Sequence, residues 1–225
     1  MDNKLYSNPA PIYESNYHFP DPSLADDTGV ICIGGDLHSQ TLIHAYSIGI
    51  FPWFNETEPI IWWCPNPRFV LYPANLKISK SMKQLLKKEA FSVTYNQCFE
   101  EVISHCKKIP RKNQEGTWIT DEMLSAYTTL HKTGYAHSVE VWESGKLVGG
   151  FYGIKIGACF FGESMFSTTS NASKYGFICF VQSFSEEIKI IDCQIHTSHL
   201  ESLGAELIKR STFLDELDKY LHYTT

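Results

Sequence analysis

The stretch from His137 to Glu163, HSVEVWESGKLVGGFYGIKIGACFFGE, constrains the fold of this chain more than any other segment. Its β-branched and aromatic residues are typical of strands, and the Ser-Gly pair between the first two runs predicts a turn. The long apolar segment that follows, residues 171–187, predicts a buried helix, and residues 188–195 predict one more strand. Strands, a helix and a strand in this order, after a series of helices, predict an α+β fold.

Helices are expected on both sides of this segment. In residues 97–108, apolar residues recur at i, i+3, i+4 and i+7, which is the spacing of one helix face. Thr120 is a favoured N-cap and Gly134 a favoured stop for a helix over residues 120–134. Further helices are expected at the C-terminal end and over residues 39–49 and 76–89.

The first 66 residues differ in texture from the rest of the chain. Turn-forming Pro, Gly and Asp residues interrupt them, and the apolar runs IFPWF and IIWWCPNPR are broken by prolines. This composition predicts a small, irregular N-terminal domain over residues 1–66 and a larger α+β domain over residues 67–225. The chain length of 225 residues allows one large domain or two smaller ones. The expected boundary therefore depends on the change from a turn-rich composition to regular helices and strands.

Charge and cysteine content narrow the functional classes. A net charge of −6 argues against a protein that simply coats nucleic acid, so any contact with phosphates requires a local basic patch. Lys80, Lys83 and Lys87 share one face of the expected helix and are the candidate patch, although such a charge run is commonly a solvated face. Seven cysteines without a Cys-x-x-Cys pair, no apolar signal sequence and no long apolar stretch predict a cytoplasmic protein without a membrane anchor.

Three polar residues at strand ends are candidates for catalysis. Glu163 lies within the apolar segment FFGESMF, where a carboxylate is costly unless it binds a cation such as an ammonium group. Asp192 and Gln194 end the last expected strand, and alternation would put their side chains on one face, where the acid could polarise the amide and carry a proton. The structural alternatives are a strand-end carboxylate at a helix N-terminus and a satisfied buried pair.

Two other groups of residues allow functional and structural interpretations. Cys193, His196 and His199 are metal-ligating types, but strand alternation turns Cys193 away and the spacing implies no fourth ligand, so no metal is expected. A group of aromatic residues, together with a basic residue such as Arg68, could stack an unpaired base, although core packing in a small domain is the commoner case. This aromatic group comprises Tyr46, Trp53, Trp62, Trp63, Trp118 and Tyr127.

Ten motifs, in order between Phe19 and Phe213, resemble those of the leucyl/phenylalanyl-tRNA–protein transferase family. The motifs are GGDL, AYSIGIFPWF, IIWWCPNPRFVLYP, GTWIT, AYTTLHKTGYAHSVEVW, LVGGFYGIKIG, FFGESMF, NASK, IIDCQ and HLESLGA. The resemblance implies transfer of Leu or Phe from aminoacyl-tRNA to the N-terminal amine of proteins that begin with Arg or Lys, which marks them for proteolysis. It also implies a GNAT-like acyltransferase domain after a small family-specific domain, with no metal or cofactor. We expect a monomer.

The resemblance also implies roles for individual residues, motif by motif. It assigns Asp192 and Gln194 as the catalytic pair and Glu163 as the acid that orients the amino group. The pocket for the Leu or Phe side chain is expected to comprise Phe151, Phe160, Met165 and Phe180. The terminal adenosine and its aminoacyl group are expected to contact Tyr46, Trp53, Trp118 and Tyr127. Phe151 departs from the methionine that is frequent in the family, and its stiffer ring could shift the choice among Leu, Phe and Met.

Two alternative functions are consistent with parts of the sequence. A GNAT-like domain could use acetyl-CoA, but the segment GESMFSTTSNASK at the strand-to-helix junction lacks a glycine-bearing pyrophosphate loop. A tRNA-binding module without catalysis would account for the aromatic residues and the lysines. Such a module would not require Glu163, Asp192 or Gln194. Transfer of leucine to a peptide that begins with Arg would exclude the binding module, and consumption of acetyl-CoA would favour the acetyltransferase.

Overall fold

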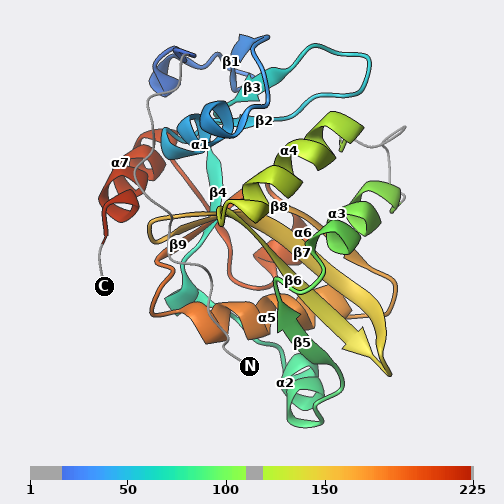
Figure 1. Cartoon of the computed structure of the whole chain (residues 1–225). Coiled ribbons are helices and arrows are strands. Elements are labelled where there is room, and N and C mark those ends of the chain that lie inside the picture. The colour runs from blue at the N-terminus through green and yellow to red at the C-terminus, as the bar shows by residue number, and fades with distance from the viewer. Residues whose placement is uncertain (1–16, 110–118, 224–225) are drawn as a thin grey trace.

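The computed structural model describes residues 17–109 and 119–223 and contains two β-sheets (Figure 1). The strands of the larger sheet are β4 (Arg68–Leu71), β5 (Ser92–Tyr95), β6 (Ala136–Glu143), β7 (Lys146–Ile156), β8 (Cys159–Ser167), β9 (Ile190–Gln194) and β10 (Glu206–Ile208). Their spatial order is β10-β4-β9-β8-β7-β6-β5. Only β8 and β9 pair in parallel within this sheet, as expected for two strands joined through a helix.

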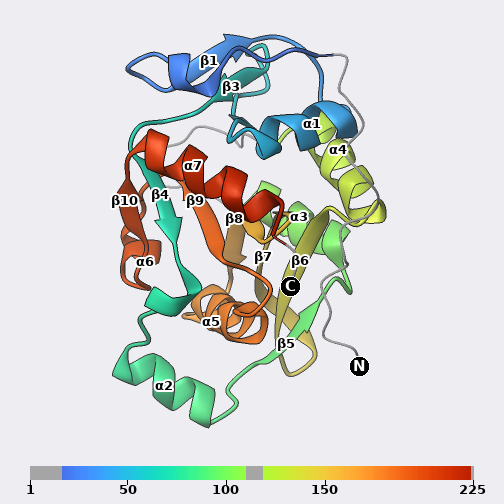
Figure 2. The same ribbon diagram turned by 90° about the vertical axis from the view of Figure 1, so that its left-hand side faces the viewer.

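Helices cover both faces of the seven-stranded sheet (Figures 1 and 2). One face packs against α5 (Ala172–Phe184), with α2 (Lys80–Lys87) and α6 (Ser198–Glu201) contributing to the same core. The other face packs against α1 (Ser39–Ser47), α3 (Phe99–Lys108), α4 (Asp121–Lys132) and α7 (Arg210–Leu221). Strand alternation separates the two cores: in β8, Phe160 points toward α5 and Phe161 points to the opposite face.

The α+β class and the main elements predicted from the sequence are confirmed. Helix α4 begins after Thr120, whose hydroxyl accepts a hydrogen bond from the Met123 backbone N–H at 3.1 Å. Ser144 and Gly145 both have positive φ, 50° and 75°, and make the turn between β6 and β7. The short strands β4, β5 and β10 lie outside the predicted elements, because strands of three or four residues depend on their partners rather than on local propensity.

The N-terminal segment is more regular than its composition predicted. Besides α1, it forms a three-stranded sheet of β1 (Val30–Ile33), β2 (Phe51–Pro52) and β3 (Ile61–Trp63), in the order β1-β3-β2. The boundary expected after residue 66 falls between β3 and β4, which belong to different sheets. Tyr46 and Trp62 are nevertheless buried in one hydrophobic core with residues of the larger sheet. This shared core fixes the N-terminal segment against one face of the larger sheet.

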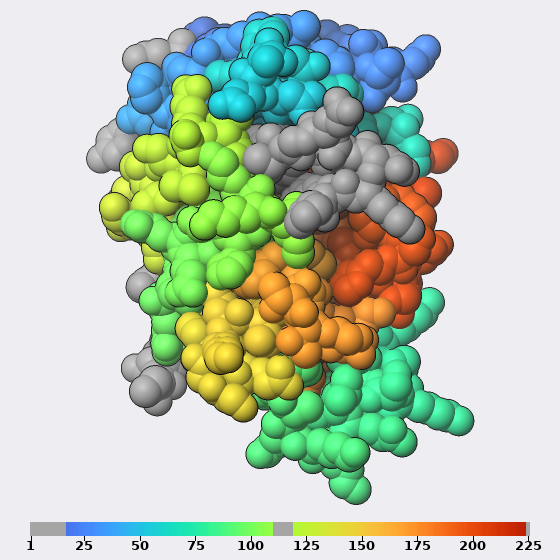
Figure 3. All heavy atoms as spheres, turned by 90° about the vertical axis from the view of Figure 1, so that its right-hand side faces the viewer, coloured from blue at the N-terminus to red at the C-terminus, as the bar shows by residue number. Residues whose placement is uncertain are grey.

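Helix α2 lies at the opposite end of the molecule from β1 and β3 (Figures 1 and 2). It protrudes from the surface (Figure 3), and its buried face is limited to Met82, with Leu85 and Leu86 partly buried. Lys80, Lys83 and Lys87 are exposed, as the helical spacing predicted. In the described part of the chain, no helix has the length and apolar character needed to cross a membrane.

Candidate active site

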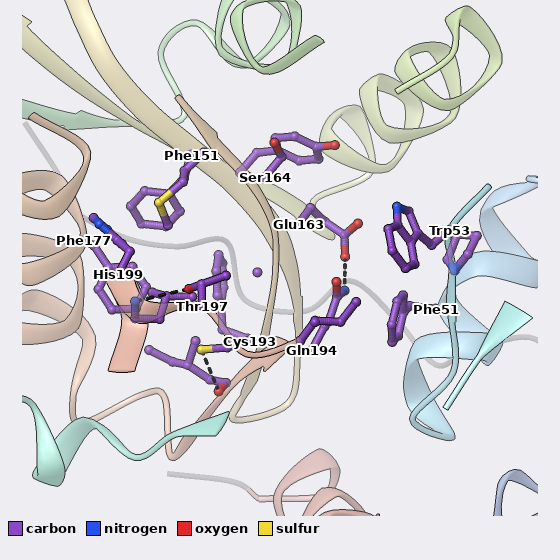
Figure 4. Close-up of a pocket in the computed structure, with 18 residues that line it drawn as sticks. Phe51, Trp53, Phe151, Glu163, Ser164, Phe177, Cys193, Gln194, Thr197 and His199 are labelled. Carbon is purple, nitrogen blue, oxygen red and sulfur yellow. Dashed lines mark hydrogen bonds between the residues drawn. The ribbon is translucent and has the colours of Figure 1, made fainter. Parts of the chain in front are cut away.

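A pocket of about 360 Å³ lies between the N-terminal segment, the middle of β8 and the end of β9 (Figure 4). Glu163, which the sequence placed at a strand end, therefore lies inside β8, where the register with β7 shifts. Phe51 and Trp53 come from the N-terminal segment, while Glu163 and Gln194 come from β8 and β9. Its volume is within the range of pockets that bind small molecules. The other lining residues are Pro52, Phe151, Tyr152, Phe160, Gly162, Ser164, Met165, Phe177, Ile191, Cys193, Ile195, Thr197, His199 and Leu200.

One end of the pocket is apolar, largely as the sequence predicted. Phe151, Phe160 and Met165 line it. Phe180, the fourth residue expected there, lies behind this wall, with its ring centroid 5.3 Å from that of Phe151 and 4.6 Å from that of Phe160. Phe177 lines the pocket instead. It precedes Phe180 by three residues on α5, so the helical period of the sequence could have indicated it.

Among the described residues that line the pocket, Glu163 is the only carboxylate, and it is held by three side chains. Its Oε1 accepts a hydrogen bond from the Tyr46 hydroxyl at 2.8 Å. The same oxygen accepts from Gln194 Nε2 at 2.9 Å (Figure 4). Its Oε2 accepts from the Tyr127 hydroxyl at 3.1 Å. The two tyrosine hydroxyls also contact each other. This polar cluster therefore joins α1, α4, β8 and β9 at one point.

Burial favours a proton on Glu163, whereas the polar cluster favours the carboxylate. Burial raises the pKa of Glu163 to about 7, although the hydrogen bonds from Tyr46, Tyr127 and Gln194 oppose the shift. Burial also raises the pKa of both tyrosines well above 10, so each hydroxyl keeps its proton at neutral pH. Three contacts join the two hydroxyls and the carboxyl group, and two tyrosine protons cannot supply all three. With a pKa of about 7, Glu163 exchanges between the protonated and the ionised form near neutral pH.

The aromatic residues expected around an adenosine occupy different environments. Tyr46 and Tyr127 lie on helices and are fully buried, so they contact Glu163 and present no free ring face for a base. Trp53 remains 37% exposed beside the pocket, with its ring centroid 5.6 Å from that of Trp63. Trp118 lies outside the described residues.

Gln194 adopts a backbone conformation that strand alternation does not predict. Its φ is +61°, a left-handed value that costs a non-glycine residue about 1–2 kcal/mol. The Gln194 backbone N–H donates to Asp192 Oδ1 at 2.9 Å, a bond that stabilises the turn. The predicted contact of the Asp192 carboxylate with the Gln194 side-chain amide is thus replaced by a contact with its backbone. The amide itself binds Glu163.

Asp192 is 1% exposed and is not among the residues that line the pocket. Both of its oxygens accept hydrogen bonds from Arg68, at 2.8 Å from Nε and 2.6 Å from Nη2. The Asp192 carboxylate therefore has no direct access to the pocket, although the sequence placed it at a reacting amine. The sequence suggested Arg68 as a partner for a stacked base, but its side chain is fully buried. Its pairing with Asp192 is a functional feature that local sequence reasoning missed.

The metal-ligating residue types do not come together. Cys193 and His199 line the pocket, whereas His196 Nε2 lies 3.3 Å from Glu201 Oε2. Across residues 17–109 and 119–223, no three His, Cys, Asp or Glu side chains lie close enough to hold a metal ion.

Comparison with known proteins adds an independent observation. The sequence matches the family model "Leucyl/phenylalanyl-tRNA protein transferase" over residues 70–218 and the model of its N-terminal domain over residues 35–66. A "Leucyl/phenylalanyl-tRNA--protein transferase" of Flavobacterium johnsoniae is 56% identical over 200 residues, which cover 88% of this chain and 94% of that protein. A protein of the same name from Syntrophus aciditrophicus is 52% identical over 209 residues, which cover 92% of this chain and 87% of that protein.

The comparison with solved structures includes remote likenesses. A GCN5-related N-acetyltransferase-like protein from Streptococcus suis superposes with a TM-score of 0.35 at 13% sequence identity. The superposition covers 76% of this chain and 64% of that chain. A likeness at this level carries no argument about catalysis.

Proposed function

The chain belongs to the leucyl/phenylalanyl-tRNA protein transferase family, and from this premise we propose that it transfers Leu or Phe from aminoacyl-tRNA to the N-terminal amine of a protein. The observation that carries the proposal is the match over most of the chain to relatives that are about half identical. The pocket is consistent with it. An apolar end lined by Phe151, Phe160 and Met165 suits a Leu or Phe side chain, and Glu163 suits the amino group of the same residue.

The chemistry requires alignment more than activation of a nucleophile. The aminoacyl ester is already reactive, and an α-amine has a reference pKa near 8, so a useful fraction is neutral at cytoplasmic pH. Holding the amine beside the ester carbonyl therefore supplies much of the rate. Gln194 Nε2 donates a hydrogen bond to Glu163. The amide oxygen of Gln194 therefore remains to accept a hydrogen bond from the attacking amine.

A proton has to leave the amine as the new C–N bond forms and the ester C–O bond breaks. Glu163 is the carboxylate within reach of the pocket, and its pKa of about 7 suits proton exchange near neutral pH. Asp192 is enclosed by Arg68 and the Gln194 backbone, so we assign it a supporting role rather than proton transfer. The proton then passes to the departing ribose oxygen of the tRNA, which balances the reaction.

The proposed acceptor is a protein that begins with Arg or Lys. We expect radiolabelled leucine to pass from charged tRNA to a peptide beginning with Arg, and not to the same peptide beginning with Ala. Scintillation counting of the separated peptides measures this directly. Equal labelling of both peptides would contradict the acceptor rule, and labelling of neither, with tRNA still bound, would contradict the transferase function. Monomeric state and a cytoplasmic location stay predictions from the sequence.

The exposed lysines of α2 are the proposed phosphate-binding residues. Reversing Lys80, Lys83 and Lys87 to Glu is expected to weaken tRNA binding and to reduce the dependence of log K on log salt concentration by about 0.9 for each phosphate that is no longer neutralised. Fluorescence titrations at several salt concentrations measure both quantities. Reversal of Lys132, Lys146 and Lys219, which are exposed on other elements, changes the net charge equally and is the matched control. An equal dependence of log K on log salt concentration in both variants would show that the α2 lysines form a solvated surface and do not bind phosphates.

A further inference from the structure

An ion pair between Arg68 of β4 and Asp192 of β9 lies in the interior, directly behind the pocket. The guanidinium donates from Nε to Asp192 Oδ1 at 2.8 Å and from Nη2 to Oδ2 at 2.6 Å, and both side chains are at most 1% exposed. Its carbon Cζ lies 4.7 Å from the ring centroid of Phe51 and 4.5 Å from that of Phe213. Desolvation offsets much of the attraction in such a pair, so stability alone is a weak reason for its presence.

The pair fixes the acceptor atom for the Gln194 turn. Asp192 Oδ1, which accepts from Arg68 Nε, also accepts the Gln194 backbone N–H at 2.9 Å. Two parallel hydrogen bonds from a planar guanidinium leave the carboxylate one orientation. Gln194 is therefore held at φ +61°, and from this conformation its Nε2 reaches Glu163 Oε1 at 2.9 Å.

Arg68 also touches the wall of the pocket without lining it. Its guanidinium packs on the ring of Phe51, which is one of the lining residues, whereas Arg68 itself is not among them. Both routes, through Asp192 to Gln194 and through Phe51, end at the proposed site of amine and ester alignment. Arg68 thus acts on the reaction only through other residues.

We propose that Arg68 is a positioning residue for aminoacyl transfer, which orients Asp192 so that Gln194 keeps the left-handed conformation that directs its amide to Glu163. The inference rests on the proposed transferase function. Misplacing a reacting group by about 1 Å can lower a rate by about 100-fold, which sets the size of the expected effect. Lysine in place of Arg68 keeps the charge but offers a single ammonium in place of the planar fork.

The test compares Arg68→Lys with Gln194→Ala in the leucine-transfer assay. We expect Arg68→Lys to lower kcat by about 100-fold with KM for aminoacyl-tRNA near the wild-type value. Loss of the Gln194 bond to Glu163 should move the acidic limb of the pH–rate profile to higher pH in both variants, because that bond lowers the pKa of Glu163. The double variant should be no slower than Gln194→Ala, since both changes remove one interaction.

Arg210→Lys is the matched control. Arg210 also makes several side-chain hydrogen bonds, but they go to the backbone carbonyls of Ser23, Ala25 and Cys64, away from the pocket. It should lower Tm without moving the pH limb or kcat. Additive effects of Arg68→Lys and Gln194→Ala, or an unmoved pH limb in Arg68→Lys, would overturn the proposal. Absence of transfer by the wild-type chain would instead overturn the proposed function.

A second variant keeps the proposal testable if Arg68→Lys fails to fold. Arg68→Met with Asp192→Asn removes both charges together and leaves no buried charge without a partner, so the chain should remain folded. The Asn oxygen can still accept the Gln194 N–H but lacks the bidentate restraint. We expect kcat to stay about 100-fold below wild type in this variant. Wild-type kcat in the folded double variant would show that the ion pair does not position Gln194.

Discussion

Replacing Glu163 with glutamine is expected to lower kcat/KM for leucine transfer by about 100-fold or more, while the protein becomes more stable above pH 7. The loss of activity follows because a neutral amide cannot accept a proton and binds an ammonium group less tightly than a carboxylate does. Transfer assays with charged tRNA and an Arg-initiated peptide measure the first effect. Glu122→Gln, a change of an exposed carboxylate on α4, is the matched control and should behave as wild type.

The change in stability has a defined sign and pH window. In the folded chain the pKa of Glu163 is raised to about 7, against an ordinary value of 4.5. Between these values the folded state binds more protons than the unfolded state, so the free energy of unfolding falls as pH rises from about 4.5 to 7 and then stays level. Glu163→Gln should lose this decline. Urea denaturation at pH 5 and pH 8 measures it, and an equal pH dependence in both proteins would contradict the raised pKa.

Replacing Asp192 with alanine is expected to lower the free energy of unfolding by about 3–5 kcal/mol, because it leaves the Arg68 guanidinium buried without its counter-charge. It also removes the acceptor of the Gln194 turn, so transfer should fall by orders of magnitude even in the folded fraction. Denaturant unfolding and transfer assays below the unfolding transition measure the two effects separately. Binding of tRNA by the folded fraction should persist, because Asp192 does not line the pocket.

Asp121→Ala provides the comparison for this large effect. Asp121 also forms an ion pair, with Lys107, but its side chain is 94% exposed. Its removal should cost less than about 1 kcal/mol. If Asp192→Ala cost no more than Asp121→Ala, the Arg68–Asp192 pair would not be the buried, restrained interaction on which its supporting role depends.

The sequence alone predicts those residues of the candidate site that differ clearly from their sequence neighbours. A carboxylate in FFGESMF and an acid and an amide at the end of an apolar strand stand out, and the structure brings Glu163 and Gln194 together at one pocket. The apolar wall of Phe151, Phe160 and Met165 was expected from the family resemblance. Strand alternation does not predict it, because a register shift in β8 between Gly162 and Ser164 is what puts Phe160 and Met165 on the same pocket. In the fold, α3 and α4 follow from helical periodicity and capping, which are local signals as well.

The remaining parts depend on contacts between distant segments. Arg68 meets Asp192 across 124 residues, and Tyr46 meets Glu163 across 117, so no window of sequence holds both partners. Strand alternation also failed at Gln194, because a side-chain hydrogen bond stabilises a left-handed residue at the strand end. The assignment of Asp192 to a reacting amine did not anticipate that Arg68 of β4 would donate to both carboxylate oxygens.

The shared core between the two sheets has a consequence for the chain as a whole. A cut between β3 and β4 would leave Phe51 and Trp53 on one fragment and Glu163 and Gln194 on the other, so each fragment would carry half of the pocket. Each would also expose apolar side chains that the intact chain buries, Trp62 on one side and Phe161 on the other. Transfer would then become a bimolecular property, with a rate that rises with the concentrations of both fragments until their association is complete.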